Sequence, residues 1–544
     1  MGLSRKRIIA SSVLVMALLV PMFSSVGAIH EDTYISPGTG PQGSPRTDGQ
    51  TVVWADSREG IPYTSDVYAA TLPDREEFAI ATGEAHQTTP DVDGSLVVWS
   101  EDDEIRAMNI DSDEQFAVST GSQDSLPAIS GDHVVWVRFD DGFSIWSRNL
   151  STMDDPVHLA DLEYALSGRP EIDGDTVLFG QADEAEGDTD GGAGWQLFKA
   201  HVDGTDLEVL VEDDAPGAHL AGFDLHGSTG VYAANEDLFA IDIDSGDSFY
   251  LASNAMSPTT DGRYVFWSDT GHIAETQEER VDLRGYDMLS DSRFVIYQDE
   301  GRNVLGNTGG DYLVWSRGFM PPEELNAHAA PISDLIPTAR QPDPGATDPN
   351  WFYFSETGHY LSYGFKNFWE QSGGLPVFGF PLTIEYDEMN LDLGEFRTVQ
   401  YFERQRFEYH PENAGTPYET QLGRLGVQDA SQRGLLDTEP FEPIAEADND
   451  DCTYFAVTSH QMCGDFRDYW EAHGLDFGDP GVSFRESLAL FGYPISEEFV
   501  DPDSGLTVQY FERARFEYHP DNPEEHRVLL GRLGADELTQ RGWN

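Results

Sequence analysis

The sequence contains very little lysine, and this shortage belongs to a strong excess of acidic residues. Lysine occurs only at Lys6, Lys199 and Lys366, and 31 Lys and Arg stand against 99 Asp and Glu, a formal net charge of −68. A surface of this charge repels nucleic acid and anionic lipid, so we expect neither as a partner. The acidity fits adaptation to high salt, a GC-rich genome that favours Arg over Lys, or a surface that attracts cations. Charge alone does not choose among these three explanations.

Long apolar runs are also missing, except at the N-terminus. Three basic residues at 5–7 precede an apolar stretch at 8–23, and small residues follow at 26–28. This order is typical of a secretory signal peptide, which we predict to span 1–28. A retained membrane anchor is the alternative, but Pro21 and the cleavage pattern favour removal. We therefore expect a secreted or cell-surface protein with no membrane span in the mature chain.

Only two cysteines are present, Cys452 and Cys463. Disulfides persist outside the membrane, so export predicts a bond between them, and two unpaired thiols are the alternative. In the chain-entropy model, a bond that closes such a short loop contributes roughly 3 kcal/mol. Two clustered cysteines are too few for a metal-binding CxxC knuckle pair.

A repeat occupies residues 45–320. Most units contain Pro, a short gap, Asp-Gly or Gly-Asp, and then a β-branched run that ends in an aromatic residue, and a weaker version with His-Gly occurs at 226–232. The first and last of these aromatics lie 261 positions apart, so the six intervals average about 43 residues. In chain order they are Trp54, Trp99, Trp136, Phe179, Tyr232, Trp267 and Trp315.

Every unit predicts three or four short strands. The run before the aromatic has the composition of a strand, and alternating runs follow, as at 66–72 and 77–82. The Asp-Gly pairs suit tight hairpins, because Gly reaches positive φ at little cost. Several short strands in about 43 residues are typical of a propeller blade.

This pattern resembles the TolB-like propeller repeats over about half of the chain. The resemblance implies a six- or seven-bladed β-propeller at 29–320, since the fifth repeat is degenerate and the seventh could close the ring. It implies no particular function, because propellers serve binding, lyase, hydrolase and peptidase-accessory roles. We interpret acidic loops such as 109–113 and 242–247 as solvated turns, because neither has the full calcium-loop spacing. The acidic tract 183–194 is interpreted as a flexible insertion.

A second repeat occurs twice in the C-terminal part. A Pro-rich linker at 321–350 leads to the first copy at 351–430, and an acidic linker at 431–451 leads to the second copy at 452–544. Both copies contain FG[FY]P, VQYFERxRFEYHP and LGRLG, after a segment with Phe and Trp at helical spacing. We expect a short amphipathic helix and a strand or hairpin in each copy, hence two small α+β modules. A module of this size has a marginal core, which a disulfide would support in the second copy.

The two copies resemble the LGFP-type repeats of bacterial envelope proteins, through GGLxxFGFPL and the following xQYFERxRFEYH. Phe-Gly replaces the Leu-Gly of that family here, and the spacing is longer. The resemblance implies attachment to cell-wall polymer, with aromatic stacking on sugar as one mode and an aromatic core as the alternative. The carboxylate and histidine pairs could do acid–base chemistry, but tandem copies favour structure or binding. The candidate ligand-binding residues are Trp369, Phe402, Glu403, His410, Trp470, Phe511, Glu512 and His519.

Motifs of the common enzyme classes are absent from the sequence. It has no Gly-x-Ser-x-Gly elbow, no His-Glu-x-x-His, no phosphate loop and no Rossmann glycine pattern. We therefore predict no catalytic residue, no metal and no cofactor, and an envelope-associated binding protein whose partner is a cell-wall or surface polysaccharide or another envelope protein. The alternatives are a secreted propeller hydrolase or lyase acting on polysaccharide or peptide, and a structural surface component.

Overall fold

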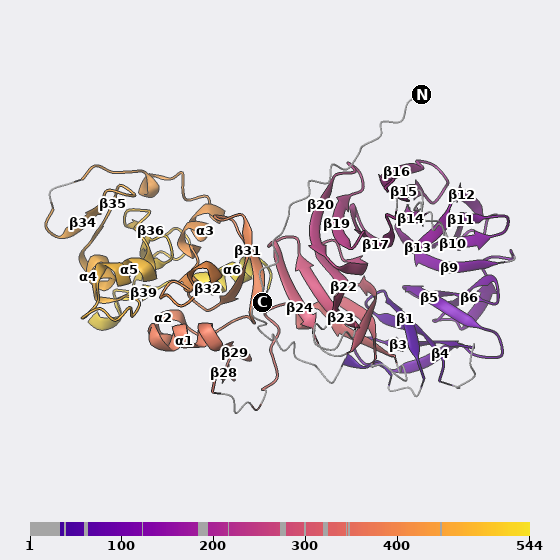
Figure 1. Ribbon diagram of the computed structural model, residues 1–544, viewed down its shortest axis with the longest axis horizontal. Coiled ribbons are helices and arrows are strands. Elements are labelled where there is room, and N and C mark those ends of the chain that lie inside the picture. Colours follow the sequence, from indigo (N-terminus) through magenta and orange to yellow (C-terminus); the bar gives the residue numbers. More distant parts are fainter. Residues whose placement is uncertain are drawn as a thin grey trace, which may run out of the picture. The chain divides into compact units, whose positions relative to one another are not determined.

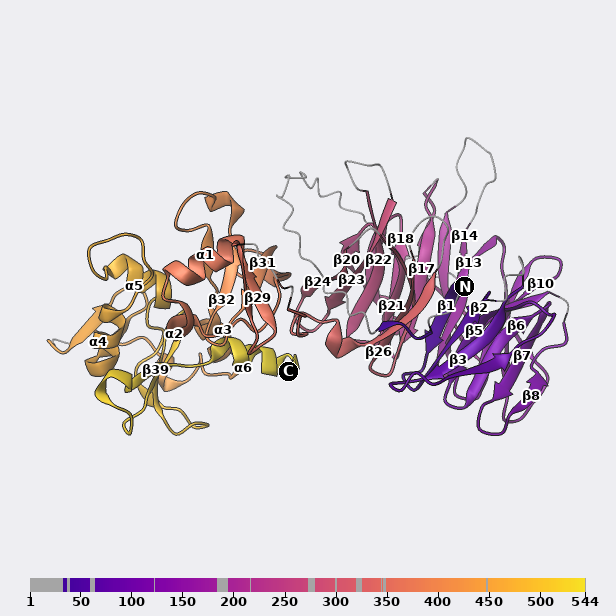
Figure 2. The same cartoon turned by 90° about the horizontal axis from the view of Figure 1, so that it is seen from below.

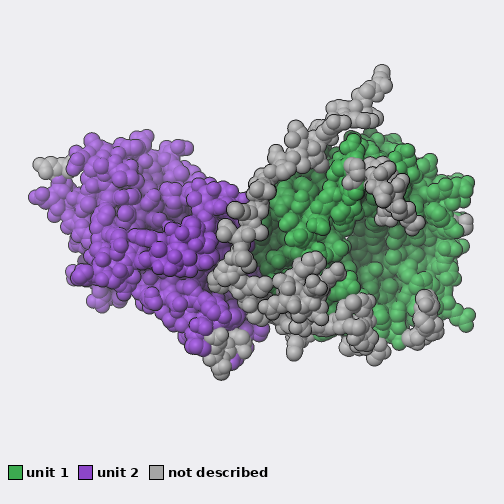
Figure 3. Space-filling model, viewed as in Figure 1, with its two compact units in different colours: residues 1–288, 293–335 green, residues 289–292, 336–544 purple. Residues whose placement is uncertain are grey.

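The computed structural model describes residues 33–543 except 37–39, 59–63, 122, 183–193, 216, 273–278, 299–300, 319–324, 344, 346–348 and 447–448. The predicted signal peptide and nearly all of the acidic insertion lie outside the described residues. The chain divides into two compact units, 1–288 with 293–335 and 289–292 with 336–544, coloured green and purple in Figure 3. Within the described part, no helix is long and apolar enough to cross a membrane.

The first unit consists of antiparallel sheets that follow one another along the chain (Figure 1). In the first five sheets, strands that are neighbours in sequence are neighbours in the sheet. The strands of the first five sheets are β1 (Gln42–Thr47), β2 (Thr51–Asp56), β3 (Asp66–Thr71) and β4 (Glu77–Ala81); β5 (Gln87–Asp93), β6 (Leu96–Glu101), β7 (Glu104–Asn109) and β8 (Glu114–Ala117); β9 (Asp124–Ser130), β10 (His133–Phe139), β11 (Phe143–Asn149) and β12 (Val157–Asp161); β13 (Ala165–Asp173), β14 (Thr176–Ala182), β15 (Trp195–His201) and β16 (Glu208–Asp213); and β17 (Leu220–His226), β18 (Thr229–Ala234), β19 (Asp237–Asp242) and β20 (Ser248–Ser253).

Further strands complete a ring. They are β21 (Ala255–Thr260), β22 (Tyr264–His272), β23 (Glu279–Asp287), β24 (Ser292–Tyr297), β25 (Arg302–Gly309), β26 (Tyr312–Gly318) and β27 (Asn326–Pro331). The first strands of successive sheets pack side by side in the order β1, β5, β9, β13, β17, β21, β25 and back to β1. The start of the chain then closes the ring, because Tyr34 pairs with His328 of β27 and the Ile35 amide donates to Ala327 O at 3.1 Å. This arrangement is a β-propeller, seen from a second direction in Figure 2, and it confirms the predicted mainly β fold.

The repeated aromatic residues form the core between the sheets. All seven lie at one position of the second strand of their sheet, and none is more than 2% exposed. Trp99, for example, packs in one apolar cluster with Val53 and Val67 of the preceding sheet. Burying large aromatic side chains against a neighbouring sheet stabilises the ring by a few kcal/mol for each residue.

The Asp-Gly turns have a second role besides turning the chain. The glycines have positive φ as expected, +57° at Gly94 and +55° at Gly131. In addition, the backbone amide of a turn glycine donates a hydrogen bond to the equivalent turn of the preceding sheet. The acceptor there is the side chain of the residue directly before the turn glycine. Three of these bonds, of 2.5 to 2.9 Å, run from Gly94 to Asp48, from Gly131 to Asp93 and from Gly227 to Asp173. The repeated acidic residue thus joins each of these sheets to the next.

The second unit contains two copies of one order of elements. Each copy begins with a two-stranded hairpin, continues through helix into a small antiparallel sheet, and ends with a helix. The first copy has β28 (Trp351–Phe354), β29 (His359–Ser362), α1 (Tyr363–Gln371), α2 (Gly374–Phe378), β30 (Tyr386–Asn390), β31 (Glu395–Tyr401), β32 (Arg406–Tyr409), β33 (Thr420–Leu422) and α3 (Leu425–Gln432). The second copy has β34 (Cys452–Phe455), β35 (His460–Cys463), α4 (Gly464–Ala472), α5 (Phe484–Phe491), β36 (Phe499–Val500), β37 (Thr507–Tyr510), β38 (Arg515–Tyr518), β39 (Val528–Leu530) and α6 (Leu533–Gln540). Short 3-10 turns lie at Ile332–Asp334, Pro411–Asn413, Glu439–Phe441 and Glu524–His526.

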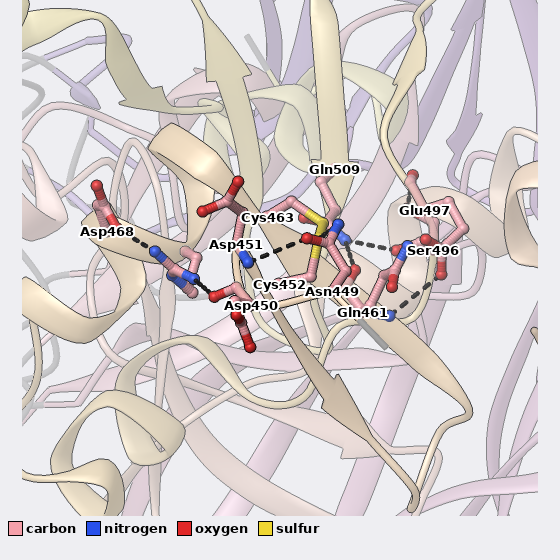
Figure 4. The surroundings of a disulfide bond; sticks show 11 residues. Asn449, Asp450, Asp451, Cys452, Gln461, Cys463, Asp468, Ser496, Glu497 and Gln509 are labelled. Carbon is pink, nitrogen blue, oxygen red and sulfur yellow. Dashed lines mark hydrogen bonds and ion pairs between the residues drawn. A yellow bond between two sulfur atoms is a disulfide. The ribbon is translucent and has the colours of Figure 1, made fainter. Parts of the chain in front are cut away.

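The predicted disulfide is present. Cys452 and Cys463 face each other across β34 and β35, with their Cα atoms 4.2 Å apart (Figure 4). The Asn449 side-chain amide donates to Cys452 Sγ at 3.0 Å, and the Asp451 amide donates back to Asn449 Oδ1 at 3.1 Å. The bond therefore fixes the hairpin that opens the second copy.

We expect the double variant Cys452→Ser/Cys463→Ser to lower the free energy of unfolding of the second unit by about 3 kcal/mol, because a closed loop of this length restricts the unfolded chain. Urea unfolding with and without reductant checks this. The wild type should lose stability on reduction, whereas the double variant should not respond. Equal stability of the oxidised wild type and the variant would contradict the expectation.

Candidate functional site

Each inner strand of the propeller carries an irregularity in the same place. The pairing of β1 with β2 shifts register between Gly43 and Arg46, and that of β5 with β6 shifts between Thr88 and Asp91. The other inner strands show equivalent shifts. At several of them a non-glycine residue has positive φ, for example 53° at Ser44 and 47° at Thr89. Bulges re-aim the next side chain, and such strained residues cluster at functional sites.

The residues after these bulges meet in the middle of the ring. Arg46 of β1 donates through Nη2 to both carboxylate oxygens of Glu171 of β13, at 2.5 Å each. β5 and β9 lie between β1 and β13 in the ring, so this contact crosses the centre. Arg169 Nη2 lies 3.3 Å from Asp91 Oδ2 of β5. These residues and Asp224 of β17 form what we call the channel cluster.

The channel cluster is largely buried and contains two guanidinium groups and three carboxylates. Side-chain exposure is 8% for Arg46, 9% for Asp91 and 13–14% for Glu171 and Arg169. Burial raises the pKa of Glu171 to about 7, although Arg46 and Arg169 act in the opposite direction. Burial also raises the pKa of Asp224, which accepts hydrogen bonds from Thr259 Oγ1 (2.6 Å) and the Thr260 amide (2.9 Å).

This arrangement offers hydrogen-bond donors and acceptors side by side, with a carboxyl group that changes charge near neutral pH. No group of three or more His, Cys, Asp or Glu suited to a metal ion occurs in the described ranges. The channel cluster was not predicted from the sequence. Its signal was the residue directly after the repeated proline, which is Arg46, Asp91 or Glu171 in three of the repeats.

The aromatic rings predicted to bind ligand lie in the core of the second unit. Phe402 and Phe511 have no exposed surface, and Trp470 is 2% exposed. The rings of Phe402 and Phe511 pack on Phe407 and Phe516, with centroids 4.1 and 4.2 Å apart. These three rings therefore have no face to offer a sugar, which corrects the stacking hypothesis in favour of its core alternative.

The fourth predicted ring, that of Trp369, is partly buried and packs against the same core. Its indole N–H donates to Gly379 O at 3.2 Å, and that of Trp470 donates to Gly492 O at 3.3 Å. Both tryptophans thus fix the FG[FY]P turn of their own copy.

The predicted glutamates connect the two copies. Arg532 of the second copy lies 2.9 Å from Glu403 of the first, and Arg424 of the first copy lies 3.4 Å from Glu512 of the second. Glu403 and Glu512 also accept hydrogen bonds from the Phe380 and Tyr493 amides, at 3.3 and 3.1 Å. Their geometry is that of a reciprocal structural link.

The predicted histidines pair with carboxylates of their own copy. His410 is 7% exposed, with Nδ1 3.0 Å from Glu412 and Nε2 3.5 Å from Glu408. Burial opposes its protonation, but the two glutamates raise the pKa of His410 overall. His519 is more open, with Nε2 3.3 Å from Glu517. The eight predicted residues thus do not form one open site.

The two copies exchange their last helices. After the first copy, α3 packs on the second sheet, where Tyr510 donates to Asp429 at 2.6 Å and Arg433 to Asp501 at 2.9 Å. After the second copy, α6 packs on the first sheet, where Arg541 donates to Glu388 at 2.5 Å and to Tyr401 at 2.8 Å. One hydrophobic cluster contains residues of both copies.

Known proteins resemble this chain only distantly. No protein-family model matches the sequence, and no curated protein is significantly similar to it, so the LGFP-type resemblance stays a prediction. Similar solved structures include the β-propeller domain of the trilobed protease from Pyrococcus furiosus, at 10% identity over 54% of this chain and 96% of that chain, with a TM-score of 0.41. An oligogalacturonate lyase from Vibrio parahaemolyticus is 11% identical over 56% of this chain and 95% of that chain, with a TM-score of 0.41. A puromycin hydrolase is 12% identical over 69% of this chain and 61% of that chain, with a TM-score of 0.42. At these identities and TM-scores, they carry nothing about the activity or ligand of this chain.

Proposed function

We propose that the protein is an exported binding protein of the cell envelope, with a seven-bladed propeller that holds a polysaccharide ligand and a second unit that attaches to envelope polymer. The observation that carries this proposal is the channel cluster, in which bulged inner strands bring paired arginines and carboxylates to the centre of the ring. Planar donors beside acceptors match sugar hydroxyl groups, which both donate and accept hydrogen bonds. The excess of negative charge keeps nucleic acid and anionic lipid away from the surface.

Sedimentation of the full mature chain with purified insoluble cell walls tests this function. We expect the wild type to bind, and Glu171→Gln to bind at least tenfold more weakly, since the most exposed carboxyl group of the channel cluster loses its charge. Glu104→Gln, at an exposed position of β7, is the matched control and should bind like the wild type. Absence of the wild type from the pellet would overturn the envelope role. Equal binding by Glu171→Gln and the wild type would show that the channel cluster takes no part in binding cell walls.

A secreted propeller hydrolase or lyase is the second candidate. The specific observation in its favour is the pKa of Glu171, raised by burial to about 7, because a general acid or base works best near the ambient pH. Turnover of polysaccharides or peptides that disappears in Glu171→Gln would support this candidate. Binding without turnover across such a panel would favour the binding protein.

A further inference from the structure

The second unit contains a cavity of about 500 Å³, and all residues that line it belong to that unit. Its walls are the segment 289–291 between β23 and β24, the turn between β30 and β31, one side of α3 and the C-terminal end of α6. Small-molecule sites typically have volumes of about 300 to 1,000 Å³. The cavity thus has the size of a ligand site, and none of the eight residues predicted from sequence lines it.

The floor of the cavity is a buried ion-pair network. Glu388 lies 2.5 Å from both Arg406 and Arg541, and all three residues are no more than 8% exposed. Arg541 also lies 2.7 Å from Glu537, and at the wall Arg424 lies 3.2 Å from Asp392. These charges compensate one another, and Asp291 adds one further carboxylate to the wall, so the cavity does not favour an anionic ligand.

The second copy lacks the long turn that forms one wall of the cavity. Glu388 and Tyr401 are 13 positions apart, whereas their counterparts Asp501 and Tyr510 are nine apart, so the turn of the first copy is four residues longer. At the second sheet, Arg433, which directly follows α3, lies 2.7 Å from Asp503 as well as 2.9 Å from Asp501. The longer turn therefore provides a wall that has no counterpart in the other half of the unit.

The upper part of the cavity is lined by neutral polar side chains. Gln428, Ser431 and Gln432 of α3 and Gln540 of α6 contribute amide and hydroxyl groups, and the last three are exposed. Amides and hydroxyls both donate and accept hydrogen bonds, as sugar hydroxyls do. Met389 and Val427 add apolar surface, which suits the C–H face of a sugar ring.

We propose that this cavity binds a segment of a neutral oligosaccharide, and, resting on the proposed function, that it is the place where the second unit attaches to envelope polymer. The neutral class follows from the compensated floor and the amide lining. An acidic polysaccharide would in addition be repelled by a chain of net charge −68.

Isothermal titration of the full mature chain tests the proposal, with linear tetrasaccharides of glucose, galactose and N-acetylglucosamine as probes and tetragalacturonate as the acidic comparison. We expect at least one neutral tetrasaccharide to bind. Ser431→Trp should weaken that binding at least tenfold by filling the cavity, and Gln540→Ala should weaken it severalfold. Thr539→Trp is the matched control, because Thr539 is the counterpart of Ser431 on α6 but does not line the cavity; it should bind within twofold of the wild type.

The cavity assignment would be overturned by no binding of any neutral tetrasaccharide, by equal weakening by Ser431→Trp and Thr539→Trp, or by tighter binding of tetragalacturonate. Weakening by Glu171→Gln instead of Ser431→Trp would place the bound sugar in the propeller and also overturn it. A different result would overturn the proposed function alone. A chain that binds a tetrasaccharide in this cavity but does not sediment with cell walls would keep the site and lose the envelope role.

Discussion

Replacement of Gly426 by alanine is expected to lower the free energy of unfolding of the second unit by about 3 kcal/mol. A Cβ at this position would lie 1.9 Å from Phe511 O and 3.0 Å from Ala514 O, both backbone atoms of the other copy. Backbone cannot yield as a flexible side chain can, so the clash has to separate α3 from the second sheet. Gly534→Ala should have the same effect, because its Cβ would lie 1.9 Å from Phe402 O.

Urea unfolding followed by near-ultraviolet circular dichroism measures this loss, and the shift on reduction of Cys452–Cys463 identifies the transition of the second unit. Gly364→Ala is the control. It lies in α1 with open space around the added methyl group, so it should leave stability unchanged or raise it by up to about 1 kcal/mol. Wild-type stability of both Gly426→Ala and Gly534→Ala would show that the helices are not exchanged between the copies.

Replacement of Arg46 by methionine is expected to destabilise the propeller by about 3–5 kcal/mol at pH 8. The change leaves Glu171 buried with only Arg169 nearby, at 3.9 Å, and an uncompensated buried charge is costly. The loss should be smaller at pH 5. The folded-state pKa of Glu171 is raised from 4.5 to about 7, so its protonated form favours folding below pH 4.5, and this contribution disappears as the pH rises through 7. At pH 5 the carboxyl group takes up a proton and needs no arginine.

Urea unfolding of the wild type, Arg46→Met and Arg46→Met/Glu171→Gln at pH 5 and pH 8 checks this expectation. The double variant has no unpaired carboxylate at this position, so it should recover most of the loss at pH 8 and show a smaller dependence on pH. The groups that face Glu171 from the other inner strands, Asp91 and Asp224, are unchanged in all three proteins. A loss that is equal at both pH values would contradict the expectation, because it would mean that Arg46 stabilises the channel by packing alone.

The sequence allowed the propeller to be predicted because its determinants repeat. A buried aromatic such as Trp99 recurs at a fixed place in each unit, and a turn such as Asp93-Gly94 precedes it, so local pattern and sheet packing coincide. The helix and hairpin of each C-terminal copy were predictable for the same reason. Both are encoded by short segments with clear spacing.

The channel cluster and the exchanged helices could not be predicted in this way. Arg46 and Glu171 are 125 positions apart, and each occupies a repeat position at which other units carry residues as different as Ala128 and Thr259. The exchange of helices cannot be predicted because the two copies are so similar in sequence. Both copies carry LGRLG before their last helix, so the sequence is equally compatible with α3 on its own sheet or on the other. Only the close backbone approach at Gly426 and Gly534 distinguishes the two arrangements.

The closure of the propeller by its first described residues also determines when the ring can form during synthesis. Tyr34 and Ile35 find their partners in β27, at His328 and Ala327, almost 300 residues later. A nascent chain that has not yet reached β27 therefore keeps the outer edge of β26 unpaired, and unpaired strand edges are sites of aggregation. Chaperones that bind the chain before residues up to about 331 are available, during synthesis or export, would meet an open arc of sheets, and the finished ring only afterwards.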